Sequence, residues 1–193
     1  MAVKNCATTL GQDILNDCNV QYGSGVEKTY YIISRDNIDW DKSTREGFIV
    51  SGIIAVTGKR GYKINNPSTE NPAITVTDTN ATIGTAFDKV LPVVMLPDSP
   101  ESAEAVMALK QDKYVVIYEN TVKGTNGNQA FVVFGWEQGA RGLDLTMDKS
   151  GDFQGGWSGN LTETNAPTSQ IFFWKTDYAT TKSALESLCS AAA

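Results

Sequence analysis

Residues 113–136, KYVVIYENTVKGTNGNQAFVVFGW, contain the pattern that decides the fold of this chain. Residues 113–119 and 129–136 are two runs rich in β-branched and aromatic residues, which strands favour. The polar connection between them carries Gly124 and Gly127, which adopt positive φ at little cost, and its Asn-Gly dipeptide is a strong turn signal. The stretch therefore predicts a β-hairpin with a long, exposed tip at residues 121–128. Because little of either strand is polar, we expect both strands in the centre of a packed sheet.

The length and composition of the chain are those of an ordinary globular protein. Its 193 residues suffice for one domain with a sizeable core, and 41% are hydrophobic and 20% charged. No run approaches the roughly 18 consecutive apolar residues that a transmembrane helix needs. Residues 1–13 lack the apolar core of a secretory signal. We therefore predict a single domain, residues 1–193, that folds in a cytoplasm.

The charge and the cysteines exclude further classes of protein. A net charge of −6 disfavours static binding of nucleic acid through its phosphates, although an acidic surface lets DNA pass without binding it. The three cysteines, Cys6, Cys18 and Cys189, are few, odd in number and far apart. This spacing predicts reduced thiols, and neither a disulfide framework nor a zinc site.

The rest of the chain reads as short strands at close spacing, with two helices and no regular β-α-β alternation. Residues 1–26 have no sustained periodicity and are predicted to form an N-terminal arm. Further strands are expected at residues 27–34, 48–56, 62–64, 73–79, 87–96, 143–148, 153–162 and 170–175. Within the 87–96 run, Pro92 predicts an edge position or a bulge.

Two helices are predicted from their capping residues. The first covers about residues 100–111 after Ser99, and the second covers residues 177–189 with Asp177 as its N-cap. Together these elements predict a mainly β fold. We expect an antiparallel β-sandwich or partial barrel, with one or two flanking α-helices and extended loops or arms.

The sequence offers no catalytic apparatus. It contains no histidine, so Ser-His-Asp and Cys-His arrangements are impossible within the chain. Residues 52–60, GIIAVTGKR, have glycines six apart and Arg60 where a phosphate-binding loop needs Ser or Thr. Residues 148–152 lack the glycine and the distal Glu of a calcium loop. We predict no enzyme, and no catalytic, cofactor-binding or metal-binding residues.

Acidic residues and tryptophans are the remaining candidates for a site. The carboxylates at 36, 39 and 41, and those at 101 and 104, fit a catalytic pair only at a suitable separation, and solvated charge is the default. Tryptophans could form a sugar-stacking platform, although they more often belong to a core or an interface. A carbohydrate-binding β-sandwich that uses Trp157 or Trp174 is therefore an open alternative; the chain has four tryptophans, Trp40, Trp136, Trp157 and Trp174.

Residues 131–174 carry a more specific pattern. An apolar strand ends in a glycine-rich bend, followed by a short strand, a polar turn with Asp and Gly, a GGW strand with alternating hydroxyls, and a final strand before a short helix. The bend contains Gly135, Gly139 and Gly142. This pattern resembles the later half of the major tail tube proteins of long-tailed bacteriophages, including prophage proteins of gut Bacteroidetes. The Ala- and Glu-rich helix before YVVIYEN fits as well, so the resemblance covers about residues 85–188.

The resemblance implies a structural virion protein that self-assembles into stacked hexameric rings and forms the conduit for DNA ejection. Sheets from six subunits would join into an inner barrel, while the arm at 1–26 and the tip at 121–128 would clasp neighbouring rings. The implied partners are other copies of the chain and other tail proteins, with no membrane and no specific DNA binding. The implied location is the virion tail, after synthesis in the host cytoplasm. Another phage structural component, such as a capsid-decorating or connector protein, is the alternative.

Overall fold

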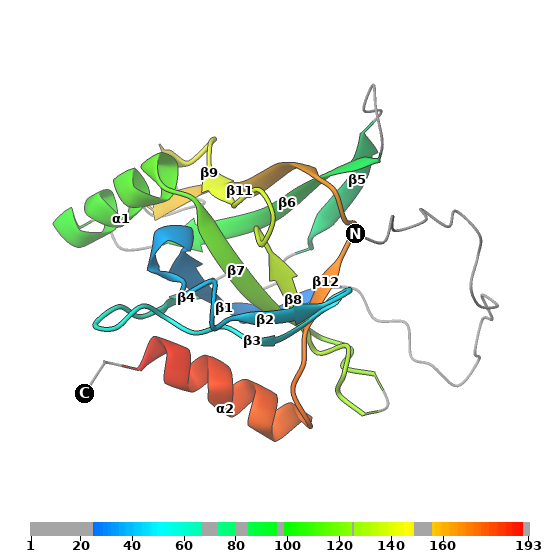
Figure 1. Cartoon of the computed structure of the whole chain (residues 1–193). Helices are drawn as coiled ribbons and strands as arrows, with labels where there is room; N and C mark the ends of the chain where they lie inside the picture. Colours follow the sequence, from blue (N-terminus) through cyan, green and yellow to red (C-terminus); the bar gives the residue numbers. More distant parts are fainter. Residues whose placement is uncertain are drawn as a thin grey trace.

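The computed structural model describes residues 25–66, 73–79, 85–95, 99–124, 126–148 and 156–190. In this part of the chain the strands form two sheets that face each other, and a helix lies on the far side of the larger one (Figure 1). The mainly β, sandwich-like fold is therefore confirmed. Most of the predicted arm lies outside the described residues, but Val26 is 1% exposed within the first strand. Val26, the last residue of the predicted arm, therefore belongs to the sheet.

The larger sheet has seven strands, and the predicted hairpin lies at its centre. The hairpin strands pair antiparallel, with Val116 opposite Phe134 and Tyr118 opposite Val132. In spatial order the strands are β2 (Thr44–Glu46), β3 (Ile49–Gly52), β12 (Ile171–Phe173), β8 (Phe131–Phe134), β7 (Tyr114–Asn120), β1 (Val26–Ser34) and β4 (Tyr62–Asn65). The central position of the hairpin is confirmed.

The smaller sheet has five strands and packs on one face of the larger sheet. Its path is β10 (Thr146–Asp148), β11 (Gly156–Ala166), β6 (Ala86–Met95) and β5 (Thr75–Thr79), and the short β9 (Arg141–Gly142) also pairs with β11. Leu91 and Leu161 from this sheet share a core cluster with Tyr30 and Val116 of the larger sheet. This cluster, which we call the inner core, fills the space between the sheets.

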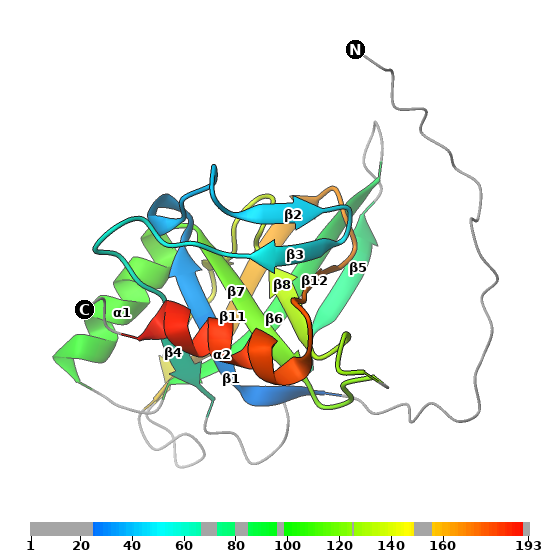
Figure 2. The same ribbon diagram turned by 60° about the horizontal axis from the view of Figure 1, so that its bottom comes forward.

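The opposite face of the larger sheet is buried as well. Its side chains, including Tyr31, Ile117 and Phe131, form a second cluster with Leu185 of α2 (Tyr178–Cys189). We call this cluster the outer core. Figures 1 and 2 show α2 lying across the sheet on the side away from the smaller sheet. Burial on both faces explains why the central strands are apolar at almost every position.

The helices begin where their capping residues predict. Ser99 accepts a hydrogen bond from the backbone N–H of Ser102 at the start of α1 (Pro100–Gln111), and Asp177 accepts one from Thr180 at the start of α2. A short 3-10 helix, η1 (Arg35–Asn37), follows β1. No helix among the described residues is long and apolar enough to span a membrane.

Several expectations about strands need correction. The two sheets form an open sandwich, as expected, but β3 runs parallel to β12, so the fold is not wholly antiparallel. The strand predicted at 48–56 is confined to Ile49–Gly52, and the polar residues Thr44–Glu46 form an additional edge strand. Pro92 lies in a central strand, where β5 pairs only as far as Val90. Among the described residues no strand pairs with Pro92 on its β5 side, so this part of the strand is locally an edge, where a missing N–H is tolerated.

Candidate functional site

The margins of the two sheets are the first candidate surface. Among the described residues, no strand pairs with the outer sides of β2 and β4 in the larger sheet or of β5 in the smaller one. Such edges present unpaired N–H and C=O groups to any strand that approaches. Two apolar side chains on these edges are also accessible, since Tyr62 is 56% and Val76 38% exposed. The edges are therefore suited to pairing with another chain.

The larger sheet also extends beyond the smaller one at its β2–β3 end. Ile49 is the register partner of Phe172, which packs against the inner core, yet Ile49 is 46% exposed. The adjacent Phe48 is 58% exposed. Exposed apolar side chains that adjoin one another can form part of a contact surface. We call Phe48 and Ile49 the apolar margin.

At the β4 end, a groove of about 820 Å³ separates α1 from the larger sheet. Its apolar lining includes Ile64, Met95, Leu109 and Tyr114. The predicted carboxylate pair, Glu101 and Glu104, contributes to its rim from α1.

The other predicted carboxylate set does not form a catalytic group. Asp36 and Asp41 are exposed, and Asp39 is bound by Lys42 at 2.7 Å. The hydrogen bond from the Lys42 ammonium lowers the pKa of Asp39. The three carboxylates thus lie around an exposed loop, in which Asp39 accepts hydrogen bonds from the backbone N–H and the ammonium group of Lys42.

The tryptophans do not gather into one platform. Trp40 and Trp136 meet edge to face, with ring centroids 5.0 Å apart, and the guanidinium of Arg35 lies 4.7 Å from the centroid of Trp40. Trp157 is half-buried in β11 and packs against the inner core, and Trp174 is half-buried after β12. The two residues expected for sugar stacking therefore lie on different sheets, and neither has a fully exposed ring.

A buried charge cluster that the sequence did not predict ties the smaller sheet to the larger one. Nζ of Lys89 lies 3.1 Å from Oε2 of Glu163, and these side chains are 3% and 0% exposed. The Glu163 carboxylate also accepts hydrogen bonds from the backbone N–H groups of Gly135 and Gln138, at 2.9 and 3.0 Å. Because both side chains are almost fully buried between the sheets, the cluster serves the fold.

The hairpin tip is less free than its sequence predicts. Gly124 and Gly127 have positive φ as expected, but Gly127 is buried against Tyr178, the first residue of α2. The Tyr178 ring stacks on Phe131 with centroids 5.6 Å apart, and its hydroxyl donates to Glu119 at 2.6 Å. The tip is therefore held against the helix, as Figures 1 and 2 also show.

Two lysines complete this contact. Lys123 binds the Glu119 carboxylate at 2.8 Å and Lys182 binds it at 3.5 Å, and both ammonium groups lie over the Tyr178 ring. Burial by itself raises the pKa of Glu119, but the hydrogen bonds from Lys123 and Tyr178 outweigh it, so that the net pKa is lowered. We call Glu119, Lys123, Phe131, Tyr178 and Lys182 the Tyr178 latch.

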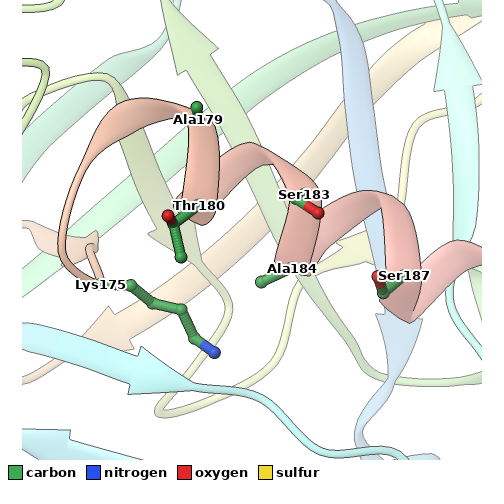
Figure 3. Close-up of a pocket in the computed structure, with 6 residues that line it drawn as sticks. All are labelled: Lys175, Ala179, Thr180, Ser183, Ala184 and Ser187. Carbon is green, nitrogen blue, oxygen red and sulfur yellow. The ribbon is translucent and has the colours of Figure 1, made fainter.

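The exposed face of α2 carries small side chains. Figure 3 shows Ala179, Ser183 and Ser187 along this face and Lys175 beside it, around a shallow hollow of about 450 Å³. At the far end of the helix, burial raises the pKa of the Cys189 thiol to about 11. Cys6 and Cys18 lie outside the described residues. Within the described ranges, no group of His, Cys, Asp or Glu is arranged to hold a metal ion.

The comparisons with known proteins add no relative. No family model matches the chain, and neither a curated protein nor a solved structure matches it.

Proposed function

We propose that this chain is a non-catalytic structural subunit that forms stacked hexameric rings, as the tail tube proteins that its sequence resembles do. The observation that carries the proposal is the larger sheet: among the described residues, no strand pairs with the outer side of the strand at either margin, and Phe48 and Ile49 are exposed beside one of them. When one margin of the sheet in one copy contacts the other margin in the next copy, the interface is heterologous. Such an interface generates a ring when the rotation between neighbouring copies brings the last copy back to the first. Closure would complete the edge hydrogen bonds that a single chain leaves open.

Two other features support this proposal. The chain has no histidine, and the acidic residues considered for catalysis lie in an exposed loop and on a helix rim, which favours a role without chemistry. A net charge of −6 also suits a conduit, because an acidic lumen repels DNA phosphates and avoids binding them.

The test is assembly of the purified full chain at high concentration, with seeding by preformed assemblies from the producing cells. Native mass spectrometry and negative-stain imaging should reveal rings of six subunits and stacks of rings. Monomers alone under these conditions would refute the proposal. Rings with a different subunit number would instead favour a connector or capsid-decorating protein.

A matched pair of variants tests the apolar margin. Ile49→Lys places a charge where closure buries a side chain, so rings should be lost while the monomer stays folded. Met107→Lys makes the same change on α1, where the side chain is 54% exposed and does not line the groove that faces β4. Met107→Lys should leave assembly unchanged. Equal loss of rings in both variants would show that the margin has no special role.

A further inference from the structure

The β4 margin of the larger sheet has a definite orientation of its backbone groups. The N–H of Asn66 donates to the carbonyl of Lys28 on β1 at 2.7 Å. Alternate residues of an antiparallel strand bond to the same neighbour, so Ile64 also faces β1. Lys63 and Asn65 therefore direct their backbone N–H and C=O groups away from β1, toward the outer side of the sheet.

The residue before β4 agrees with this orientation. The N–H of Gly61 donates to the carbonyl of Leu188 on α2 at 2.9 Å, so it points away from β1. Lys63 lies two positions later and has the same orientation. Among the described residues, no strand pairs with this side of β4. An extended segment that approaches here can bond Lys63 and Asn65 through its own backbone.

The groove beside α1 lies where such a segment would project its side chains. Tyr62 and Ile64 line the groove from β4, and their register partners on β1 belong to the inner core. The helix α1 lines it from the side of the smaller sheet (Figure 1), where the small side chains of Ala105 and Ala108 leave room. Side chains of a strand alternate between its faces. Every second residue of an added strand would therefore enter this groove of about 820 Å³.

The rim of the groove is acidic. Glu101, Glu104 and Asp112 line it, and none of them forms an ion pair with another described residue. Lys63 also lines it, but its ammonium group is bound by Glu186 of α2. A Lys or Arg side chain has an apolar stem and a cationic end. Such a side chain therefore matches both the apolar lining and the acidic rim.

The other margins of this chain do not have that chemistry. On β2, Arg45 is followed by Glu46, and on β5 the one charged residue is Asp78. Neither strand is basic. Charge complementarity at the groove therefore favours a strand from a different protein.

We propose that the β4 margin binds an extended segment of another protein, which adds a strand beside Lys63 and Asn65 and places apolar and basic side chains in the groove under α1. The backbone hydrogen bonds provide affinity, and the groove selects the side chains. One consequence rests on the proposed function: the segment occupies a margin that ring closure needs, so it keeps the chain from assembling.

The first experiment titrates the monomeric full chain in a calorimeter with the synthetic peptide Thr-Lys-Thr-Val-Thr-Lys-Thr. Its order reads the same in both directions, so it presupposes no strand direction. One control peptide has Glu in place of Lys, and another has the same composition in the order Thr-Thr-Lys-Lys-Val-Thr-Thr. A third is a copy of residues 44–52, the other margin of the sheet. The probe should bind about tenfold more tightly than each control, as two favourable ion pairs allow.

The second experiment locates the probe by hydrogen exchange. At saturating probe, the amides of Lys63 and Asn65 should exchange about tenfold more slowly, because they gain partners on the outer side of β4. The amide of Ile64 faces β1 in the free chain, so its exchange should change little. Only an added strand produces this alternation along β4.

Charge variants test the acidic rim. Glu101→Gln/Glu104→Gln should weaken binding of the probe about tenfold, because it removes both carboxylates of α1 that line the groove. Asp41→Asn/Glu46→Gln removes two exposed carboxylates that do not line the groove, so it should leave binding unchanged. Equal weakening by both double variants would reduce the effect to net charge and overturn the role of the rim.

A second pair of variants tests the groove itself. Ala108→Trp places a large ring in the groove and should weaken binding by more than about tenfold. Ala103→Trp makes the same change at an exposed position of α1 that does not line the groove, and should have no effect. If Ala108→Trp fails to fold, the charge variants and the exchange experiment still decide the proposal.

Several results would overturn the proposal. Failure of the probe to bind, or equal binding of the reordered peptide, would exclude an added strand with selected side chains. Binding without slower exchange at Lys63 and Asn65 would place a ligand in the groove and no strand on β4. Slow exchange of these amides in the free monomer would show that the margin is already covered. Equal binding of the 44–52 peptide would make a second copy the occupant.

A last measurement separates this inference from the proposed function. The probe, added at saturation, should prevent ring formation, whereas the Glu-containing peptide should not. Rings that form with the probe bound would overturn the blocking consequence. A chain that forms no rings without any peptide would refute the proposed function, while titration and exchange would still decide whether the β4 margin binds the segment.

Discussion

Replacing Glu163 with Gln should destabilise the sandwich by about 3–5 kcal/mol, because it leaves the Lys89 ammonium buried without a counter-charge. Glu163 and Lys89 are register partners on β11 and β6, and the charged atoms are 3.1 Å apart with both side chains almost fully buried. Gln has nearly the size of Glu, so a cavity contributes little to this cost.

The hydrogen bonds to Glu163 predict an order among further variants. Glu163→Leu removes the acceptor for the N–H groups of Gly135 and Gln138, and each unpaired donor adds about 1–3 kcal/mol. Lys89→Met should cost the least of the three, because the carboxylate keeps those two donors. The double variant Lys89→Met/Glu163→Gln should cost less than the sum of its single changes, with a coupling of about 1–3 kcal/mol.

Urea unfolding followed by tryptophan fluorescence measures these differences, provided that the m value stays constant. For a chain of this length, a loss of about 3–5 kcal/mol corresponds to a fall in Tm of roughly 6–20 °C. Met107→Lys, an exposed change, is the control for substitution as such. A cost below about 1 kcal/mol for Glu163→Gln, or strict additivity in the double variant, would refute the view that the pair is mutually dependent.

Three further outcomes are expected. Gly135→Ala should lower the free energy of unfolding in urea by about 2–5 kcal/mol, since Gly135 has φ +79° and an added Cβ would lie 2.2 Å from the carbonyl oxygen of Tyr114. Gly47→Ala is the control: Gly47 has φ +57° but open space around it, so this change should lower the free energy of unfolding by only about 1–2 kcal/mol. The pKa of Glu119 is lower in the folded chain than in the unfolded one, so the stability that ionised Glu119 contributes is present above the ordinary carboxylate pKa and is lost as pH falls through the folded pKa. The difference in unfolding free energy between wild type and Glu119→Gln should therefore shrink on acidification. A difference that stays constant would contradict this. The pKa of Cys189 is raised to about 11, so at pH 8 maleimide should label its thiol more slowly in the folded chain than in the chain unfolded by urea, as measured by mass spectrometry of the Cys189 peptide. The stability that comes from keeping this thiol neutral is present below its unfolded pKa and is lost as pH rises through about 11.

The central hairpin could be predicted because its physical signals are local. Its strands are apolar at most positions since both faces are buried, and the tip needs positive φ at Gly124 and Gly127. The helix starts at Ser99 and Asp177 were predictable for the same reason, because a cap acts on backbone groups within one turn.

The missed strand features depend on partners distant in the sequence. Thr44–Glu46 is polar and forms a strand only because β3 lies beside it, and the parallel pairing of β3 with β12 joins residues more than 100 positions apart. Pro92 is compatible with a central strand because β5 pairs with β6 only as far as Val90. The sequence around Pro92 does not indicate how far β5 extends.

The buried charge cluster did leave a signal in the sequence. Alternation along a strand places Glu163 on the same face as Leu161, and Lys89 on the same face as Leu91 and Val93. Two opposite charges at inward positions of two strands predict a buried pair if the strands are neighbours. The pairing of β6 with β11 supplies that condition, which sequence reasoning alone did not establish. The contact of Tyr178 with the hairpin gave no comparable signal, because it joins Glu119 to a helix residue 59 positions later.

The position of α2 at the end of the described chain affects synthesis. Proteins are made from the N-terminus, and their domains fold as units during or after that process. Until residues 178–189 emerge from the ribosome, the outer-core side chains of β1, β7 and β8, among them Tyr31, Ile117 and Phe131, have no helix to cover them. A nascent chain or a truncation product that ends before Tyr178 would present this bare sheet face to the cell. Such fragments should therefore aggregate or bind chaperones, and full solubility should appear only once the last twelve-residue helix is complete.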